Sequence, residues 1–125
     1  MKSLIIALAL LLAVTARAHE MVPTYPEWSR GIYPGILTTT IKMFNKRKDV
    51  EYYEIGVFDK DFKPIFFVAD YKIVKLQYAS SISIDVYIAK ENRERVEYIC
   101  SRSKIRKDQE TRTAVSSRIC SRFRK

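Results

Sequence analysis

Apolar residues recur at every second position through most of the chain, which is the spacing of a β-strand with one buried face. The clearest run covers residues 81–88, and its inward face carries four branched residues, Ile82, Ile84, Val86 and Ile88. Residues 36–45 alternate in the same way and are rich in the β-branched side chains that strands favour. Residues 50–58 repeat the pattern, with every second residue apolar. We therefore expect three well-defined strands in these stretches.

The remaining stretches complete an all-β chain. Residues 71–78 predict a weaker strand, and residues 95–103 and 113–123 predict the last two strands, joined by a charged loop at 104–112. Residues 89–94 form a polar connection with room for one helical turn. Turn residues at this spacing favour an antiparallel β-sandwich of about seven strands over a parallel α/β fold.

The first 18 residues have the pattern of a secretory signal peptide and not of a folded element. Lys2 supplies a positive start, residues 4–14 are an unbroken apolar run, and Ala16-Arg17-Ala18 is a small-x-small cleavage pattern. The run is short for a bilayer span, and a membrane anchor that stays attached is the alternative. We expect cleavage after Ala18, a single domain over residues 19–125, and export to the periplasm or, as an alternative, secretion.

Charge is distributed unevenly along the chain, which carries a formal net charge of +9. Residues 19–100 hold 12 basic and 12 acidic residues, whereas residues 101–125 hold nine basic and two acidic ones. Such an asymmetry predicts an anionic partner for the C-terminal segment. The alternative is a solvated basic edge that prevents aggregation between strands.

The two cysteines lie late in the last two predicted strands. A hairpin centred on Glu110 places Cys100 opposite Cys120, and export to an oxidising compartment favours a disulfide between them. Closing this loop of 21 residues is worth about 3 kcal/mol in the chain-entropy model. Two free buried thiols are the alternative. The same register pairs Tyr98 with Arg122 and sets two like charges, Arg102 and Arg118, against each other, which requires solvent or an anion between them.

An apolar row follows the last predicted strand, on the face opposite the cysteines. It consists of Val115, Ile119 and Phe123. One interpretation is that these side chains fill the core, since buried apolar residues are the commoner case. The other is that they are exposed on an edge strand, where they invite pairing with another chain. The pattern alone leaves both interpretations open.

Catalytic chemistry finds little support, and we predict that the protein is not an enzyme. One histidine and two cysteines are too few for a structural zinc site, and the three glycines are isolated, so no metal or cofactor is expected. Asp59 and Asp61 lie in a polar turn. His19 is expected to be an exposed residue at a mobile N-terminus, unsuited to act as a base. Residues 19–35 hold three prolines and predict an extended segment at a sheet edge, with Trp28 contributing packing and not ligand stacking.

The order of these stretches resembles the N-terminal immunoglobulin-like domain of periplasmic pilus-assembly chaperones. The likeness is carried by Val74-Lys75-Leu76, then residues 83–88, then residues 95–100, a charged loop, and residues 113–125. Residues 36–45 and 52–58 are similar to that domain's second and third strands. The resemblance implies an immunoglobulin-like sandwich whose last strand is lent to an incomplete pilin subunit, and a subgroup of the family bonds its last two strands through a disulfide.

The resemblance also implies which residues would serve a client. In the family a lysine of the last strand and an arginine near the start hold the subunit's terminal carboxylate. Cys120 stands at about the lysine position here, with Arg118 and Arg122 as neighbours, and Arg30 is the candidate for the arginine. The family carries two such domains, and this chain carries one.

Two functions follow as hypotheses. The first is an exported, periplasmic chaperone-like module that pairs its edge strand with a client polypeptide such as a pilus subunit, through Val115, Ile119, Phe123, Arg118 and Arg122. The second is a structural or adhesive protein of the envelope, or a secreted one, that binds anionic surfaces through its basic C-terminal hairpin. Neither hypothesis involves a small-molecule substrate.

Overall fold

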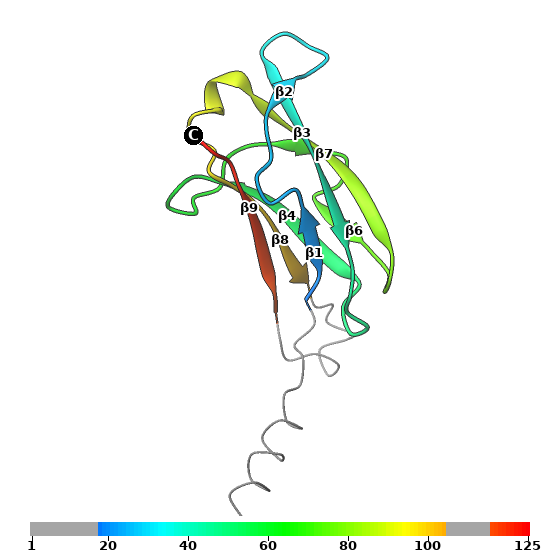
Figure 1. The fold of residues 1–125 in the computed structure, drawn as a ribbon. Coiled ribbons are helices and arrows are strands. Elements are labelled where there is room, and N and C mark those ends of the chain that lie inside the picture. Colours follow the sequence, from blue (N-terminus) through cyan, green and yellow to red (C-terminus); the bar gives the residue numbers. More distant parts are fainter. Residues whose placement is uncertain (1–17, 105–115) are drawn as a thin grey trace, which may run out of the picture.

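The runs with the clearest alternation form the longest strands. In the computed structural model, which describes residues 18–104 and 116–125, β3 (Ile36–Phe44) and β7 (Ser81–Ala89) pair antiparallel along their whole length (Figure 1). β4 (Tyr52–Phe58) lies in the facing sheet and buries every second residue, beginning with Tyr53. Ile84, which faces inward from β7 as predicted, is fully buried. The inward faces predicted for these three strands are therefore confirmed.

Two antiparallel sheets make up the fold. The first has the order β1–β3–β7–β5, in which β1 is Glu20–Val22 and β5 is Val68–Ala69, and β2 (Ser29–Arg30) also pairs with β3. The second has the order β6–β4–β8–β9, in which β6 is Ile73–Lys75, β8 is Tyr98–Lys104 and β9 is Arg118–Arg122. One sheet contains β1, β3, β7 and β5, and the facing sheet contains β4, β8 and β9. This is the strand arrangement of an immunoglobulin-like sandwich.

The hydrophobic core lies between the two sheets. Its largest fully buried side chains come from both layers: Tyr53, Ile41, Met43, Ile84, Ile88 and Ile99. Residues from the connections add to it, including Ile65, Phe67 and Leu76. Trp28, Ile82 and Ile119 are partly buried against this core. Most polar residues of the alternating strands lie on the outer faces, as a sandwich requires, while Thr39, Ser101 and Ser103 are buried on the inner faces.

The short elements differ in detail from the sequence-based expectation. The structure describes nine strands and not about seven, because the proline-containing segment adds β1 and β2 at the edge of the first sheet. The stretch expected as one strand at 71–78 forms only the three residues of β6, preceded by β5 in the other sheet. The single helical turn expected at 89–94 is present as the 3₁₀ turn η1 (Lys90–Asn92).

The last hairpin has the predicted register. Cys100 lies opposite Cys120, Tyr98 opposite Arg122, and Arg102 opposite Arg118. Both strands are shorter than predicted, since β8 begins only at Tyr98 and β9 covers five residues. The predicted loop at 104–112 and the first residues of the predicted strand 113–123 fall largely outside the described residues, as does the predicted signal peptide up to residue 17.

Candidate functional site

β9 is the outer strand of its sheet, and its backbone groups alternate between β8 and the free edge. Ser103 N donates to Ser117 O at 2.8 Å, and Phe123 N donates to Glu97 O at 3.0 Å, so the odd-numbered residues face β8. The even-numbered residues Arg118, Cys120 and Arg122 therefore direct their N–H and C=O groups outward.

The chain's first described residues run alongside this outer edge. His19 contacts Ser117 by a side-chain hydrogen bond, and Ser121 Oγ donates to Pro23 O at 2.6 Å. Arg122 N donates to Thr24 O at 3.0 Å, which occupies one of the outward backbone groups. Within the part of the chain that the structure describes, β8 is the only strand that pairs with β9. The outward backbone groups of Arg118 and Cys120 thus make no backbone hydrogen bond with another described strand, although β1 lies beside them, and Arg122 N is bonded to Thr24.

A disulfide joins β9 to β8, as the sequence predicted. Cys100 and Cys120 are bonded, and their Cα atoms lie 4.0 Å apart. They lie on the outer face of the sheet, yet Cys100 is only 2% exposed. The residue opposite Cys100 on β4 is Gly56, and a Cβ there would lie 2.6 Å from the Phe58 ring. The glycine therefore lets that aromatic ring lie flat against the sheet beside the disulfide.

An aromatic cluster covers the outer face next to the disulfide. The Phe62 ring stacks on Tyr98 at a centroid distance of 4.6 Å and lies 6.1 Å from Phe58. The Arg118 guanidinium lies 5.1 Å from the Phe62 ring centroid, within range for a cation–π contact. Phe62 reaches this position because the turn at 59–64 folds back, held by Asp59 Oδ1, which accepts hydrogen bonds from the amides of Asp61 and Lys63.

The structure separates the members of the predicted client-binding row. Phe123 is 6% exposed, and its ring stacks on Trp28 at 4.5 Å, so it belongs to the core and is not part of an exposed row. Ile119 is partly buried and packs against the same core. Both point inward because odd-numbered residues of β9 face the other sheet. Val115 lies outside the described residues. The expectation that Trp28 provides packing is confirmed.

The cations of the hairpin are matched locally by acidic or aromatic groups. Glu54 on β4 accepts from Arg102 at 2.9 Å and from Lys104 at 3.0 Å, and these two cations lower the pKa of its carboxyl, Lys104 most. Glu54 also resolves the like-charged pair, since Arg102 turns to it while Arg118 lies over Phe62.

A second carboxylate serves the end of β9 in the same way. Glu97 pairs with Arg122 at 2.8 Å and with Lys125 at 3.2 Å, and these hydrogen bonds lower the pKa of Glu97. The Arg124 guanidinium lies 4.0 Å from the Tyr25 ring centroid. The basic excess of the C-terminal segment is therefore largely engaged in the part that the structure describes.

The expectation for His19 is wrong. Its side chain is 2% exposed, and its ring contacts three residues that are distant in sequence. Nε2 lies 2.7 Å from Ser101 Oγ, Nδ1 lies 3.2 Å from Ser117 Oγ, and the ring centroid lies 4.5 Å from that of Tyr53. Burial lowers the pKa of His19, and the nearby Arg47 adds to the effect. A position next to a predicted cleavage site gave no signal that the residue would be enclosed between two sheets.

Other buried polar groups continue from His19 toward the same end of the sandwich. Tyr53 Oη donates to Asn45 Oδ1 at 2.6 Å, and Asn45 Nδ2 donates to the carbonyls of Val50 and Leu76. Burial raises the pKa of Tyr53 to about 12. Arg47 is held by Asp49 at 2.6 Å and lies within 3.4 Å of Ser117 Oγ. Each of these groups has a partner, so the cluster is suited to holding the chain and not to binding a reactant.

Neither a metal centre nor a catalytic pair emerges from the described residues. They contain no group of three histidine, cysteine or acidic side chains that could hold a metal ion. Ser101 Oγ is next to a histidine nitrogen, but Ser101 is fully buried and cannot reach a substrate. Asp59 and Asp61 act together in a turn, as predicted, since Asp59 bonds to the backbone of Asp61.

No model of a known protein family matches this chain, and a search among curated proteins found no relative. Within residues 18–104 and 116–125, the structure contains no helix with the length and apolar character that crossing a bilayer requires.

Proposed function

We propose that this chain is an exported chaperone-like binding module that receives a strand of a client polypeptide on the outer edge of β9, in the place where β1 lies beside it. The observation that carries the proposal is the pair of outward backbone positions at Arg118 and Cys120, to which no described strand is hydrogen-bonded. Strand addition draws affinity from main-chain hydrogen bonds and specificity from alternate side chains. An edge held in place by a disulfide loses little conformational entropy when a client strand adds to it.

The position of Thr24 limits how far such a client strand extends. Arg122 N is already bonded to Thr24, so pairing starts at Cys120 and proceeds toward the N-terminal end of β9. There the client's backbone meets Arg118, whose guanidinium lies on the outer face of the sheet beside Phe62. The inward position of Phe123 removes it from the contact surface, so the contact rests on the main chain of β9.

The engagement of the hairpin cations favours this function over binding of anionic surfaces through the C-terminal hairpin. Arg102 and Lys104 are paired with Glu54, and Arg122 and Lys125 with Glu97. Cations that already have carboxylate partners contribute little to a further anionic partner, because each contact would replace an existing one. Strand pairing needs no free cation.

The test is a variant that removes one backbone donor from the edge. Arg118→Pro deletes an N–H that faces outward, so the ladder to β8 keeps its hydrogen bonds, and proline is accepted at edge positions of this kind. Arg118→Ala keeps the N–H and removes the guanidinium. The client is recovered from the periplasm of the producing cells by a tag on this protein. We expect Arg118→Pro to lose the client while Arg118→Ala retains it.

Two results would overturn the proposal. One is equal recovery of the client by the wild type and Arg118→Pro, with both proteins folded. The other is loss of the partner by Arg118→Ala and by moderate salt, which would identify an ionic contact and favour the anionic-surface alternative.

A further inference from the structure

The loop between β2 and β3 presents two apolar side chains at its tip. Ile32 is 88% exposed, the highest value for a large apolar residue in the part of the chain that the structure describes, and Tyr33 is 73% exposed. Gly31 N donates to Ile36 O at 2.9 Å and Ile36 N donates to Tyr33 O at 3.2 Å, so the loop is closed at its base. Figure 1 shows it projecting from one end of the sandwich, beyond β2.

Three cations surround the base of this loop. Arg30 from β2 and Lys90 and Arg93 from the turn after β7 line a pocket of about 640 Å³ together with Ile32 and Tyr33. None of the described residues that line this pocket is acidic. Lys90 N donates to the carbonyl oxygen of Gly35 at 2.8 Å, which holds the turn against the loop. An exposed apolar tip beside a pocket whose only charged lining residues are basic has the charge of a surface that meets an anionic partner.

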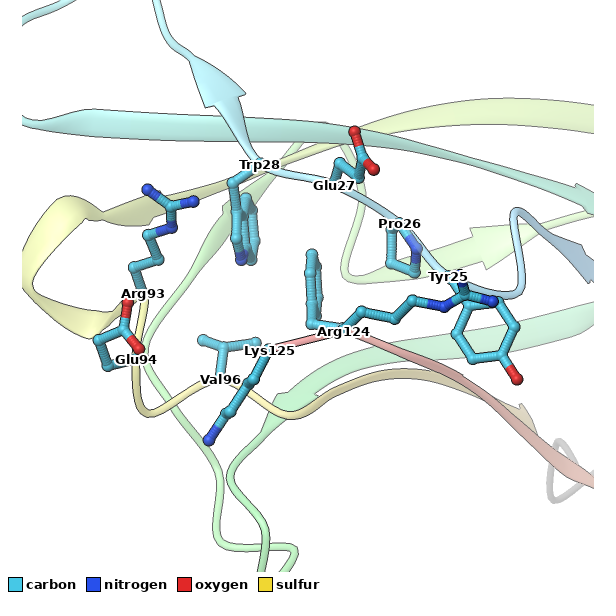
Figure 2. Close-up of a pocket in the computed structure, with 10 residues that line it drawn as sticks. Tyr25, Pro26, Glu27, Trp28, Arg93, Glu94, Val96, Arg124 and Lys125 are labelled. Atoms are coloured by element: carbon cyan, nitrogen blue, oxygen red, sulfur yellow. The ribbon is translucent and has the colours of Figure 1, made fainter.

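Trp28 gives a second, independent observation. It lies between this pocket and a neighbouring one of about 530 Å³, which it lines with Arg93, Arg124 and Lys125 (Figure 2). The indole Nε1 is buried and has no hydrogen-bond partner among the described groups. A buried donor without a partner is uncommon in native proteins and is satisfied when a ligand brings an acceptor oxygen. Two carboxylates, Glu27 and Glu94, also border this second pocket.

We propose that this end of the sandwich docks onto an anionic lipid bilayer. Ile32 and Tyr33 enter the boundary between headgroups and acyl chains, where the amphipathic ring of a tyrosine is favoured. Arg30, Lys90 and Arg93 contact the headgroup phosphates. Two side chains that project from a loop are buried completely only when the partner surrounds them. A bilayer surrounds them without needing a preformed pocket. The docking surface goes beyond the proposed function, because it lies at the end of the molecule remote from Arg118.

Vesicle flotation tests the proposal. The chain from His19 to Lys125 is mixed with neutral vesicles of phosphatidylcholine, or with anionic vesicles that also contain about 30% phosphatidylglycerol. We expect flotation with the anionic vesicles and weak flotation with the neutral ones. Trp28 is the only tryptophan of the chain, so its emission reports directly on this end of the molecule and should shift to shorter wavelength when the bilayer covers it.

Two matched pairs of variants separate this surface from general adhesion. Ile32→Ser with Tyr33→Ser should weaken flotation by about tenfold or more, since both side chains leave the bilayer. Phe66→Ser with Tyr71→Ser removes two apolar residues that are 76% and 56% exposed elsewhere, and should leave flotation unchanged. Lys90→Gln with Arg93→Gln should weaken binding by about fivefold per cation, while Lys42→Gln with Lys75→Gln should not.

Equal losses in a test pair and its control pair would overturn the proposal, because they would indicate nonspecific adhesion. Flotation that survives Ile32→Ser with Tyr33→Ser would also overturn it and would move binding to the C-terminal cations. If Trp28 emission responds to inorganic phosphate and the protein does not float with vesicles, the ligand is a small soluble anion and not a bilayer. Since all of these positions are exposed, the melting temperatures of the variants should match that of the wild type.

Discussion

At the scale of single residues, buried polar side chains attach the first described residues to the rest of the sandwich. His19 reaches Ser101 and Ser117 through its two ring nitrogens and packs on the Tyr53 ring. Burial, and to a smaller extent the nearby Arg47, lowers the pKa of His19 and so favours its neutral imidazole. Its protonation state is therefore coupled to the attachment of β1.

The pH dependence of stability should show this coupling. The pKa of His19 is lowered from 6.5 in the folded protein, so the unfolded chain takes up the proton first. Its contribution to stability is complete above pH 6.5 and is lost as the pH falls from there toward the folded-state pKa. Thermal melting between pH 7.5 and 5 should show a falling melting temperature, and His19→Gln should flatten the slope. The carboxyls of Glu54 and Glu97 titrate below this window. Equal slopes in both proteins would contradict the assignment.

Ile119 tests which face of β9 is buried. Ile119→Asp places a carboxylate against the core and should lower the free energy of unfolding by about 2–4 kcal/mol. Ile73→Asp is the matched control, because Ile73 is 55% exposed on β6, the opposite edge strand of the same sheet, and should change stability by about 0.5 kcal/mol at most. Denaturant titration of both variants gives the comparison. A stable Ile119→Asp protein that has lost its client would restore the exposed-row interpretation.

At the scale of elements, alternation predicted the long strands because it depends only on neighbours in the sequence. β3, β4 and β7 have no competing signal, and the hairpin register, with Cys100 opposite Cys120, followed from centring the hairpin on Glu110. The short strands could not be predicted in the same way. β5 and β6 are only two and three residues long, and their sheet is chosen by contacts with β7 and β4, which are distant in sequence. The edge position of the first residues depends likewise on β9.

The disulfide between β8 and β9 should stabilise the domain without being essential to it. It joins residues separated by 20 positions, and loop closure of that size is worth about 3 kcal/mol. Cys100→Ala with Cys120→Ala should lower the free energy of unfolding by about that amount and leave a folded protein, because the core between the sheets is independent of the bond. Denaturant titration measures the loss. Mass analysis of the wild type without reductant should show the mass of the bonded pair, and free thiols would refute the prediction.

At the scale of the whole molecule, residues 19–24 connect the two sheets at their open side. β1 pairs with β3 in one sheet, while Pro23 and Thr24 accept hydrogen bonds from Ser121 and Arg122 in the other. The prediction of an extended segment at a sheet edge is confirmed, but the segment also covers part of β9. The sequence could predict that the candidate site lies on the last strand. It could not predict which backbone groups of β9 lack a partner, because that depends on the contacts of residues 19–24 with this strand.

Removal of that segment should be costly. A chain that begins at Tyr25 loses the buried side chains of His19 and Met21 and the pairing of β1, and its melting temperature should fall by about 10 °C or more. It also leaves the edges of β3 and β9 uncovered, so size-exclusion chromatography should show self-association. The chain that begins at His19 is the control. A monomeric shortened chain with an unchanged melting temperature would show that the segment has no structural role.

The contacts of residues 19–24 have a consequence for the order of events when the protein is made. His19 and Pro23 meet partners 98 positions later in the chain, so these residues cannot complete their contacts until Ser117 and Ser121 have been made. Pairings of such long sequence separation form late, because the intervening chain must be ordered first. A product that stops before β9 leaves Cys100 and the outer edge of β8 without a partner, and leaves Pro23 and Thr24 without their contacts to Ser121 and Arg122. Proteases would therefore meet an open sandwich in every copy that stops before β9.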